Sequence, residues 1–463
     1  MSVNVQHDLK AQDDSGHIAA GAVVASRAPE ESPEVGHGND IEPPDGGLVG
    51  WMQVAGSFAL YFNHLGLLNS FGAFQAYYET VLLTSSSPSA ISWIGSVQIF
   101  CFMAVAILVG PLYDAGYCRI LILVGAGMIS VGFMLTSIST TYWQILLAQG
   151  ICVGLGTCCI SVPSIAVVPM YFKKRRALAM ATATLGSGLG ATIHPLIFQS
   201  LTRTAGFGWA VRVIGFIALV LCLFAFLVIR PRAGPTPAWR KEGFSFKWFY
   251  DTSAFRERPF LLFCVAIFFN NLAFFQPNFY LQSYALSHGM RGHDLARYLL
   301  SIMNASSIPG RIIASLIADK VGALDTFAVI CAFSSASIFY WISVTNVAGN
   351  IAFPVLYGFF SGGVVALASV VITYITPDMS RLGTRLGMVS ILKGVASLVG
   401  PPISGALLEA TGSYLGVQLF SALGMMLTAL FSAVLRIDIA RSDLKASRQE
   451  DRDGTVPRQD PEA

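Results

Sequence analysis

The sequence is poor in charge. Only 12% of its 463 residues are Asp, Glu, Lys or Arg, whereas 54% are hydrophobic. Soluble domains carry about 25% charged residues, so this composition is too apolar for a water-exposed surface. Long apolar runs recur along the chain, and several exceed the roughly 20 residues that span a hydrocarbon core. We therefore expect a protein that crosses a lipid bilayer many times.

Three other features that the sequence lacks narrow the class of protein further. The eight cysteines show neither a disulfide framework nor the His/Cys spacing of a zinc site. No cleavable signal sequence is recognisable, and residues 1–49 are typical of a disordered acidic tail. No cluster of His, Asp or Glu offers the chemistry of a membrane-embedded enzyme. We expect no catalysis, no cofactor and no metal.

The apolar runs predict an all-α membrane protein of twelve transmembrane helices in two six-helix half-bundles. The N-terminal half covers residues 50–230 and the C-terminal half residues 259–436. A basic linker, 231–258, joins them, and residues 437–463 form a second charged tail that we expect to be disordered. The twelve predicted spans are 50–78, 90–112, 119–138, 142–169, 177–201, 208–230, 259–285, 294–318, 323–343, 348–375, 385–408 and 413–436.

Positive charge is distributed unevenly over the connections. Those after even-numbered spans, the linker included, hold fifteen Lys and Arg residues, against three after odd-numbered spans. Because connections rich in Lys and Arg stay in the cytoplasm, both tails are predicted to be cytoplasmic. We expect a monomer in the plasma membrane, with a small-molecule substrate and no nucleic acid as partner.

A short motif is repeated six spans apart. Residues 110–114 (GPLYD) follow span 2, and residues 315–319 (SLIAD) follow span 8. An acidic residue at a helix end beside a basic loop can latch neighbouring helices together. The candidates for such a gating or structural latch are Asp114, Asp319, Arg175 and Arg176.

The span count, the basic linker and the doubled motif together resemble the major facilitator superfamily. More narrowly, the chain resembles its monocarboxylate-porter branch, especially the fungal members. The matching stretches are 44–47 (PDGG) with Trp51, 69–72 (NSFG), 171–177 (YFKKRRA), 186–190 (GSGLG), 400–405 (GPPISG) and 411–414 (TGSY). The resemblance covers about residues 43–436. It implies a secondary transporter whose halves rock around a central site.

Two cations lie deep in predicted spans. Arg311 precedes Asp319 by eight residues, and Lys393 follows Arg385 by eight on a helix of opposite direction. At about 1.5 Å per residue, both lie roughly 12 Å from the cytoplasmic end. Intramembrane charges normally face a cavity or a partner, so we expect an anion-binding wall. The alternative is that the two side chains snorkel to the interface or bond helix carbonyls.

The branch resemblance fails at two places. In the better-known animal members an aspartate precedes the span-8 arginine by one turn, and a lysine stands in span 1. The corresponding positions here are Ser307 and Asn69. The resemblance to the animal members therefore does not extend to their proton-coupled transport of lactate-type substrates. Asn69 is instead a candidate substrate contact. No Asp or Glu lies deep in a span to neutralise Arg311.

The remaining candidates are neutral amides and histidines. Asn270, Asn271 and Gln276 in span 7, near a helix break expected at Pro277, are candidates for substrate hydrogen bonding or for interhelical bonds. His64 and His194 titrate near neutral pH when unperturbed, so they are proton-coupling candidates; the alternative is a packing role. The pairs Gly186/Gly190 and Gly358/Gly362 predict close helix contacts.

The function we predict is secondary transport of a small organic solute, an organic anion or secondary metabolite, with efflux as the favoured direction. One alternative is an uptake carrier for a monocarboxylate or a vitamin-like nutrient. An alternative of another class is a non-transporting membrane sensor of the same fold, which would be expected to carry a long signalling extension.

Overall fold

The computed structural model describes residues 46–172, 175–232, 251–290, 292, 294–376 and 382–453. Residues 1–45, Lys173, Lys174, most of the basic linker and residues 454–463 therefore lie outside the described part. Within it, every regular element is a helix. The α-helices of this part are α1 (Gly47–Asn69), α2 (Phe71–Tyr77), α3 (Pro88–Ala104), α4 (Ala106–Leu112), α5 (Cys118–Ile138), α6 (Tyr142–Ile145), α7 (Gly154–Ala166), α8 (Arg176–Thr204), α9 (Phe207–Val228), α11 (Arg258–Phe274), α12 (Gln276–Ser287), α13 (Leu299–Val321), α14 (Ala323–Ile342), α15 (Val347–Tyr374), α16 (Leu382–Thr411) and α17 (Leu415–Asp453).

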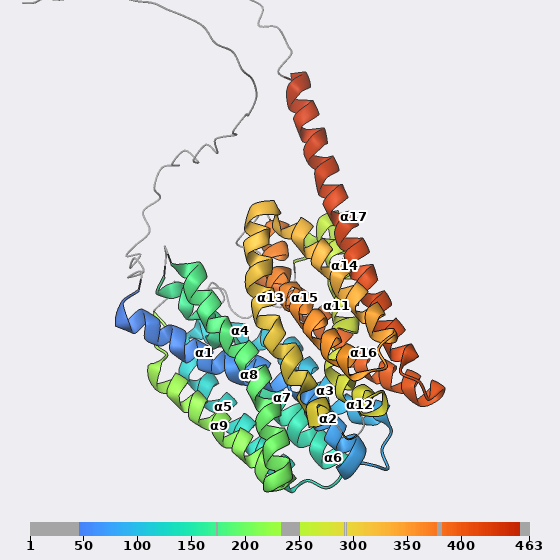
Figure 1. Ribbon diagram of the computed structural model, residues 1–463. Helices are drawn as coiled ribbons and strands as arrows, with labels where there is room; N and C mark the ends of the chain where they lie inside the picture. Colours follow the sequence, from blue (N-terminus) through green and yellow to red (C-terminus); the bar gives the residue numbers. More distant parts are fainter. Residues whose placement is uncertain are drawn as a thin grey trace, which may run out of the picture. The chain divides into compact units, whose positions relative to one another are not determined.

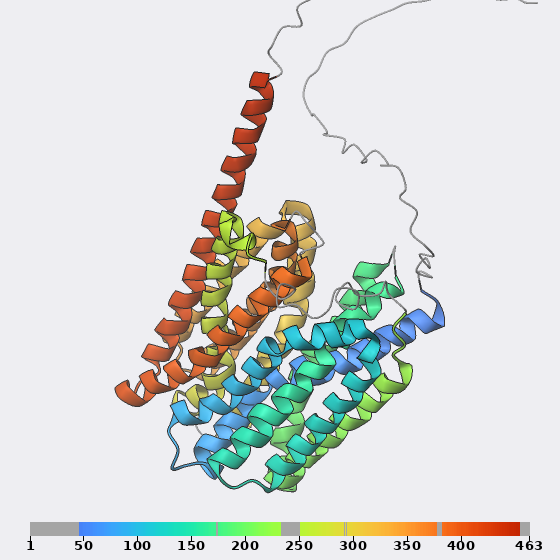
Figure 2. The same ribbon diagram turned by 180° about the vertical axis from the view of Figure 1, so that it is seen from behind.

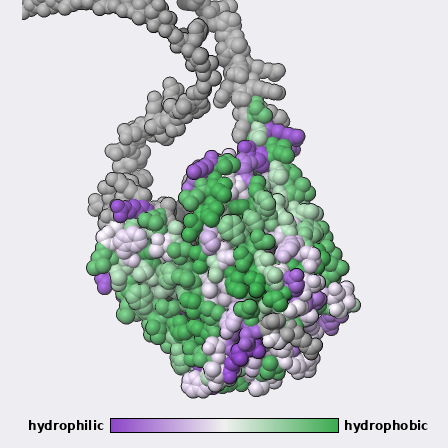
Figure 3. All heavy atoms as spheres, in the orientation of Figure 1, coloured by the Kyte–Doolittle hydropathy of each residue, from purple (hydrophilic) through white to green (hydrophobic). Residues whose placement is uncertain are grey.

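These helices occupy all twelve predicted spans. Nine helical segments of the described chain are long and apolar enough to cross a membrane on their own, and one of them, Pro88–Ile138, contains two predicted spans. The first predicted span, formed by α1 and α2, is not among these nine segments, and neither is the fifth, formed by α8. Figure 3 shows hydrophobic residues over most of the face in view, as expected of a lipid-facing surface. The all-helical membrane fold is confirmed.

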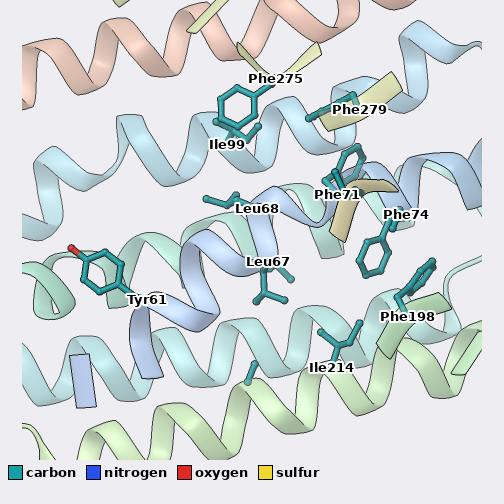
Figure 4. Close-up of a cluster of buried hydrophobic side chains, with 14 of the residues drawn as sticks. Tyr61, Leu67, Leu68, Phe71, Phe74, Ile99, Phe198, Ile214, Phe275 and Phe279 are labelled. Carbon is teal, nitrogen blue, oxygen red and sulfur yellow. The ribbon is translucent and has the colours of Figure 1, made fainter. Parts of the chain in front are cut away.

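The helices form two groups (Figures 1 and 2). In one, α1 packs on α8 and α9; in the other, α13 packs on α15 and α14 on α17. The groups meet where α2 contacts α12 and where α3 lies along α16. Figure 4 shows aromatic residues packed inside this region, with Phe71 and Phe279 facing each other from opposite groups at 4.9 Å between ring centroids.

Glycine permits the tightest helix contacts, as the spacing of the pairs predicted. A Cβ at Gly190 of α8 would lie 2.2 Å from the Phe62 carbonyl oxygen of α1. A Cβ at Gly362 of α15 would lie 2.3 Å from the Ser307 carbonyl oxygen of α13. Neither position can carry a side chain without moving a backbone, so small residues set the separation of both helix pairs.

The predicted break near Pro277 is confirmed. Helix α11 ends at Phe274 and α12 begins at Gln276, with Phe275 between them. The first span breaks in the corresponding way, between α1 and α2 at Ser70. Each half therefore begins with a helix in two pieces, and both breaks adjoin residues that line the cavity described below.

Two expectations about the chain ends and connections need correction. The tail from residue 437 was expected to be disordered, but α17 continues without interruption to Asp453. Arg385, taken as part of a cytoplasmic connection, is buried at the start of α16. It forms ion pairs with Asp251 at 3.2 Å and Glu257 at 2.5 Å. Its local sequence gave no sign of these partners, which lie more than 100 positions earlier in the chain.

Candidate functional site

A cavity of about 130 Å³ lies between the two groups of helices. Leu65 and Asn69 of α1 and Met103 of α3 line it from the N-terminal side. Helices α11, α12, α13, α15 and α16 supply the rest of the wall. The polar and charged residues among them are Asn270, Asn271, Asn278, Asn304, Ser307, Ser361, Arg311 and Lys393.

Arg311 and Lys393 face this one cavity from α13 and α16. The depth estimate placed them at one level, and the structure brings them to one site. No Asp or Glu is among the lining residues of the described chain. The wall contributed by the C-terminal half is therefore cationic, which favours an anion in the cavity.

The guanidinium of Arg311 is partly satisfied from the opposite half. Its Nη1 donates to Ser187 Oγ of α8 at 2.5 Å. Its Nε is buried and has no partner among the described residues. Lys393 is in no hydrogen bond or ion pair within the described chain. An arginine with an unused N–H and a lysine with an unpaired ammonium are suited to receive acceptor oxygens from a ligand.

Four of the five lining asparagines use their amide donors on the protein itself. Asn69 donates to the Leu65 carbonyl at 2.9 Å, Asn271 to Ile267 at 2.9 Å, and Asn304 to Ala191 at 3.1 Å. Asn270 donates to Met425 Sδ at 3.5 Å. In the part of the chain that is described, none of the four side-chain oxygens accepts a hydrogen bond, so they are available to ligand donors.

Three predicted site residues lie outside the cavity. Gln276 is buried at the helix break and donates to the Leu272 carbonyl. His64 is enclosed between α1 and α7, with Nε2 3.0 Å from Ser164 Oγ. His194 is enclosed against α1, and its Nδ1 lies 2.8 Å from the Gly190 carbonyl oxygen. This placement favours the packing alternative for both histidines.

The candidate latch residues lie at corresponding ends of the two halves. Asp114 lies in the short π-helix Tyr113–Tyr117, between α4 and α5, and Asp319 in the last turn of α13. Arg175 is exposed immediately before α8, and Arg176 is its first residue, with a side chain outside the described part. A latch between these groups stays a prediction.

Sequence reasoning missed Ser187, Asn278 and Asn304. Asn304 could have been found, because it precedes Ser307 by three residues and Arg311 by seven, which places all three on one helix face. Ser187 gave no such signal. It lies between two glycines that bring α8 close to its neighbours, and only the meeting of α8 with α13 gives it a role.

The comparisons with known proteins agree with this architecture. Residues 49–352 match the family model described as Major Facilitator Superfamily. The chain belongs to the major facilitator superfamily. It is thus an integral multi-pass membrane protein and a secondary transporter rather than an enzyme.

Its relatives include fungal transporters of this superfamily. The aspyridones efflux protein of Emericella nidulans is 40% identical over 389 residues, which cover 84% of this chain and 78% of that protein. An MFS-type transporter of the same organism is 39% identical over 377 residues, or 81% and 83% of the two chains. The agnestins efflux protein of Paecilomyces divaricatus is 36% identical over 386 residues, or 83% and 87%.

A solved structure shares the fold. The nucleoside transporter NupG, as its D323A mutant, superposes with a TM-score of 0.64 over 85% of this chain and 99% of that one. The two sequences are 12% identical, so the likeness concerns the helix arrangement alone.

Proposed function

We propose that this transporter exports a small organic anion, of the kind produced as a secondary metabolite, by alternating access. The observation that carries the proposal is the pair of cations, Arg311 and Lys393, facing one cavity that no described carboxylate lines. A buried charge without a counterion is costly. A substrate that brings the missing negative charge recovers part of this cost.

The rest of the lining defines the substrate further. Apolar side chains, among them Leu65, Met103 and Phe274, line the cavity beside the cations. The free oxygens of Asn69, Asn271 and Asn304 suit hydroxyl or amide donors. We infer an amphipathic solute with one acidic group, an apolar body and at least one hydrogen-bond donor.

Arg311 also suggests how binding is linked to movement. Its bond to Ser187 joins α13 to α8, and thus one half to the other. A substrate anion that takes over this guanidinium releases Ser187 and weakens a contact between the halves. Because binding then favours one arrangement of the halves over another, it shifts the conformational equilibrium.

The direction of transport rests on the relatives. Two of them are named for efflux, of aspyridones and of agnestins. We also propose a monomer in the plasma membrane. The distribution of Lys and Arg supports cytoplasmic positions for both termini. The half-bundles are assigned to residues 50–230 and 259–436, and the chain to the monocarboxylate-porter branch on the stretches quoted above.

Flux into inside-out vesicles tests the proposal. A panel of carboxylates, acidic enols and matched neutral compounds is offered to the wild type, Arg311→Ala and Lys393→Met. We expect an anionic member to be transported. Loss of a charged hydrogen bond of about 1.5–3 kcal/mol predicts a flux reduction of roughly 10- to 150-fold for Arg311→Ala. Lys393→Met, which removes an unbonded charge, should have a smaller effect.

Arg441→Ala is the matched control, because this arginine is exposed on α17, away from the cavity. Unchanged flux in Arg311→Ala contradicts the anion site. Equal flux of the acids and their neutral analogues contradicts the substrate class. Flux only from the extracellular side supports the uptake alternative, and binding without any flux supports the sensor alternative.

A further inference from the structure

The halves are fastened together at one end of the bundle, called the seam here. The seam is formed by the chain around α2, the start of α3 and the ends of α8, α12 and α16. Ser89 Oγ donates to the Pro402 carbonyl at 2.9 Å, and Arg203 pairs with Asp294 at 3.1 Å on the surface. The seam lies at the opposite end from Asp114 and Asp319, and thus on the extracellular side in the proposed orientation.

One carboxyl group lies within the seam. Glu79 follows α2, just beyond the first predicted span. Its Oε2 accepts from Ser283 Oγ of α12 in the other half at 2.6 Å, and its Oε1 accepts from Gln75 Nε2 at 2.8 Å. Both oxygens are thus held by neutral donors, and one of the two bonds crosses between the halves.

No cation compensates this carboxyl group. Within the described chain Glu79 forms no ion pair. Burial raises the pKa of Glu79 above the ordinary 4.5 of glutamate, although the hydrogen bonds from Ser283 and Gln75 offset part of the rise. A carboxyl group in such surroundings takes up a proton more readily than one in water.

The titratable groups that face Glu79 directly are tyrosines. Tyr280 of α12 and Tyr414, before α17, face it from the C-terminal half, and Tyr78 adjoins it on its own segment. Tyrosine titrates near 10. His288 stacks on Tyr284, and its Nδ1 lies 2.9 Å from Ser287 Oγ. The charged groups at this end include Arg203 and Arg297, which both pair with Asp294, and Glu409, which is exposed near the end of α16.

We propose that Glu79 is a proton-binding site that controls the seam: its carboxyl group binds a proton more readily while the halves are closed there than when they part. Opening breaks the bond to Ser283 and exposes the carboxyl group to water, where ionisation is favourable. Below the raised closed-state pKa the closed seam binds more protons than the open one. By linkage, falling pH therefore stabilises closure, within a window that extends upward from about 4.5.

Spin labels can measure the seam directly. Labels are attached through noncanonical amino acids at Ser85 and Ser287, which are exposed on the two sides of the seam. Inter-label distances are measured in nanodiscs between pH 4.5 and 8. We expect the short-distance population of the wild type to grow as pH falls. Glu79→Gln, which imitates the protonated state, should hold that population high at every pH.

Two further variants make the test selective. Glu409→Gln removes an exposed carboxyl group near the end of α16 and should respond as the wild type does. Ser283→Ala removes a donor that favours the ionised form, so the midpoint should rise by roughly one pH unit. A wild type without pH response, Glu79→Gln with an intact response, or Glu409→Gln without one would each overturn the proposal. The readout needs no substrate, so it is independent of the organic-anion assignment.

Discussion

In the N-terminal half α8 approaches α1 at Gly186 and Gly190, and in the C-terminal half α15 approaches α13 at Gly358 and Gly362. Each half also begins with a helix in two pieces, α1 with α2 and α11 with α12. The halves thus repeat the same solution for packing helices without a large apolar driving force between them.

They differ in where ionisable side chains lie at membrane depth. His64 and His194 of the N-terminal half are enclosed and hydrogen-bonded inside it. Arg311 and Lys393 of the C-terminal half face the cavity. The same framework therefore leaves one wall of the cavity neutral and makes the other cationic. We infer that the C-terminal half recognises the charge of the substrate, while the N-terminal half supplies Ser187 and neutral contacts.

The largest effect is expected where the C-terminal half holds a fully paired arginine. Arg385→Ala removes the buried arginine that pairs with Asp251 and Glu257, which should cost about 3–5 kcal/mol of stability. Thermal unfolding of the purified protein measures this as a lowered Tm. Arg311→Ala should change Tm much less, because no carboxylate is left unpaired. Equal losses in the two variants would remove the distinction between structural and ligand-facing arginines.

Whether the glycine contacts of the two halves are equivalent can be tested by adding one methyl group to each half. Gly190→Ala and Gly362→Ala should each destabilise by about 1–3 kcal/mol, because a backbone must move. Gly127→Ala on α5 is the control, since no atom lies within 4 Å of its added Cβ. The Tm values of the three variants measure these losses of stability. A loss confined to one half would show that the packing is not equivalent.

The role of the N-terminal wall is tested at Ser187. Ser187→Ala removes the bond that holds Arg311 across the halves, so a substrate anion no longer competes with it. We expect the apparent Kd for an anionic substrate to fall, by up to about tenfold for a bond of roughly 1.4 kcal/mol. Ligand-induced thermal shifts measure this change. Weaker binding instead would make Ser187 a substrate contact and not a competitor.

The smallest effects are expected at the enclosed histidines. His64→Gln and His194→Gln should alter flux less than about twofold and leave its pH dependence unchanged, since neither ring lines the cavity. Flux across vesicles at two pH gradients provides the measurement. A pH profile lost in either variant would restore the proton-coupling hypothesis and give the N-terminal half a charged role.

Part of the fold and of the candidate site followed from the sequence, because the features concerned depend on residues that are close together in the chain. Hydropathy and length placed the twelve helices, and the helical rise put Arg311 and Lys393 at one depth. The glycine spacing predicted where helices come closest, and Pro277 predicted the break in span 7. Each inference uses only neighbouring residues in one segment, whose conformation in a bilayer is almost fixed by the need to satisfy its own backbone.

Tertiary structure decided which faces meet. The sequence showed that Arg311 lacks a carboxylate, but only the contact of α13 with α8 supplies Ser187. The sequence placed Arg385 at the start of the eleventh span without a partner, whereas packing against the chain before α11 buries it with two acids. His64 and His194 share the depth of a transport site, yet the rotation of their helices turns them away from it. Depth is a property of one helix, whereas burial and pairing depend on segments far apart in the chain.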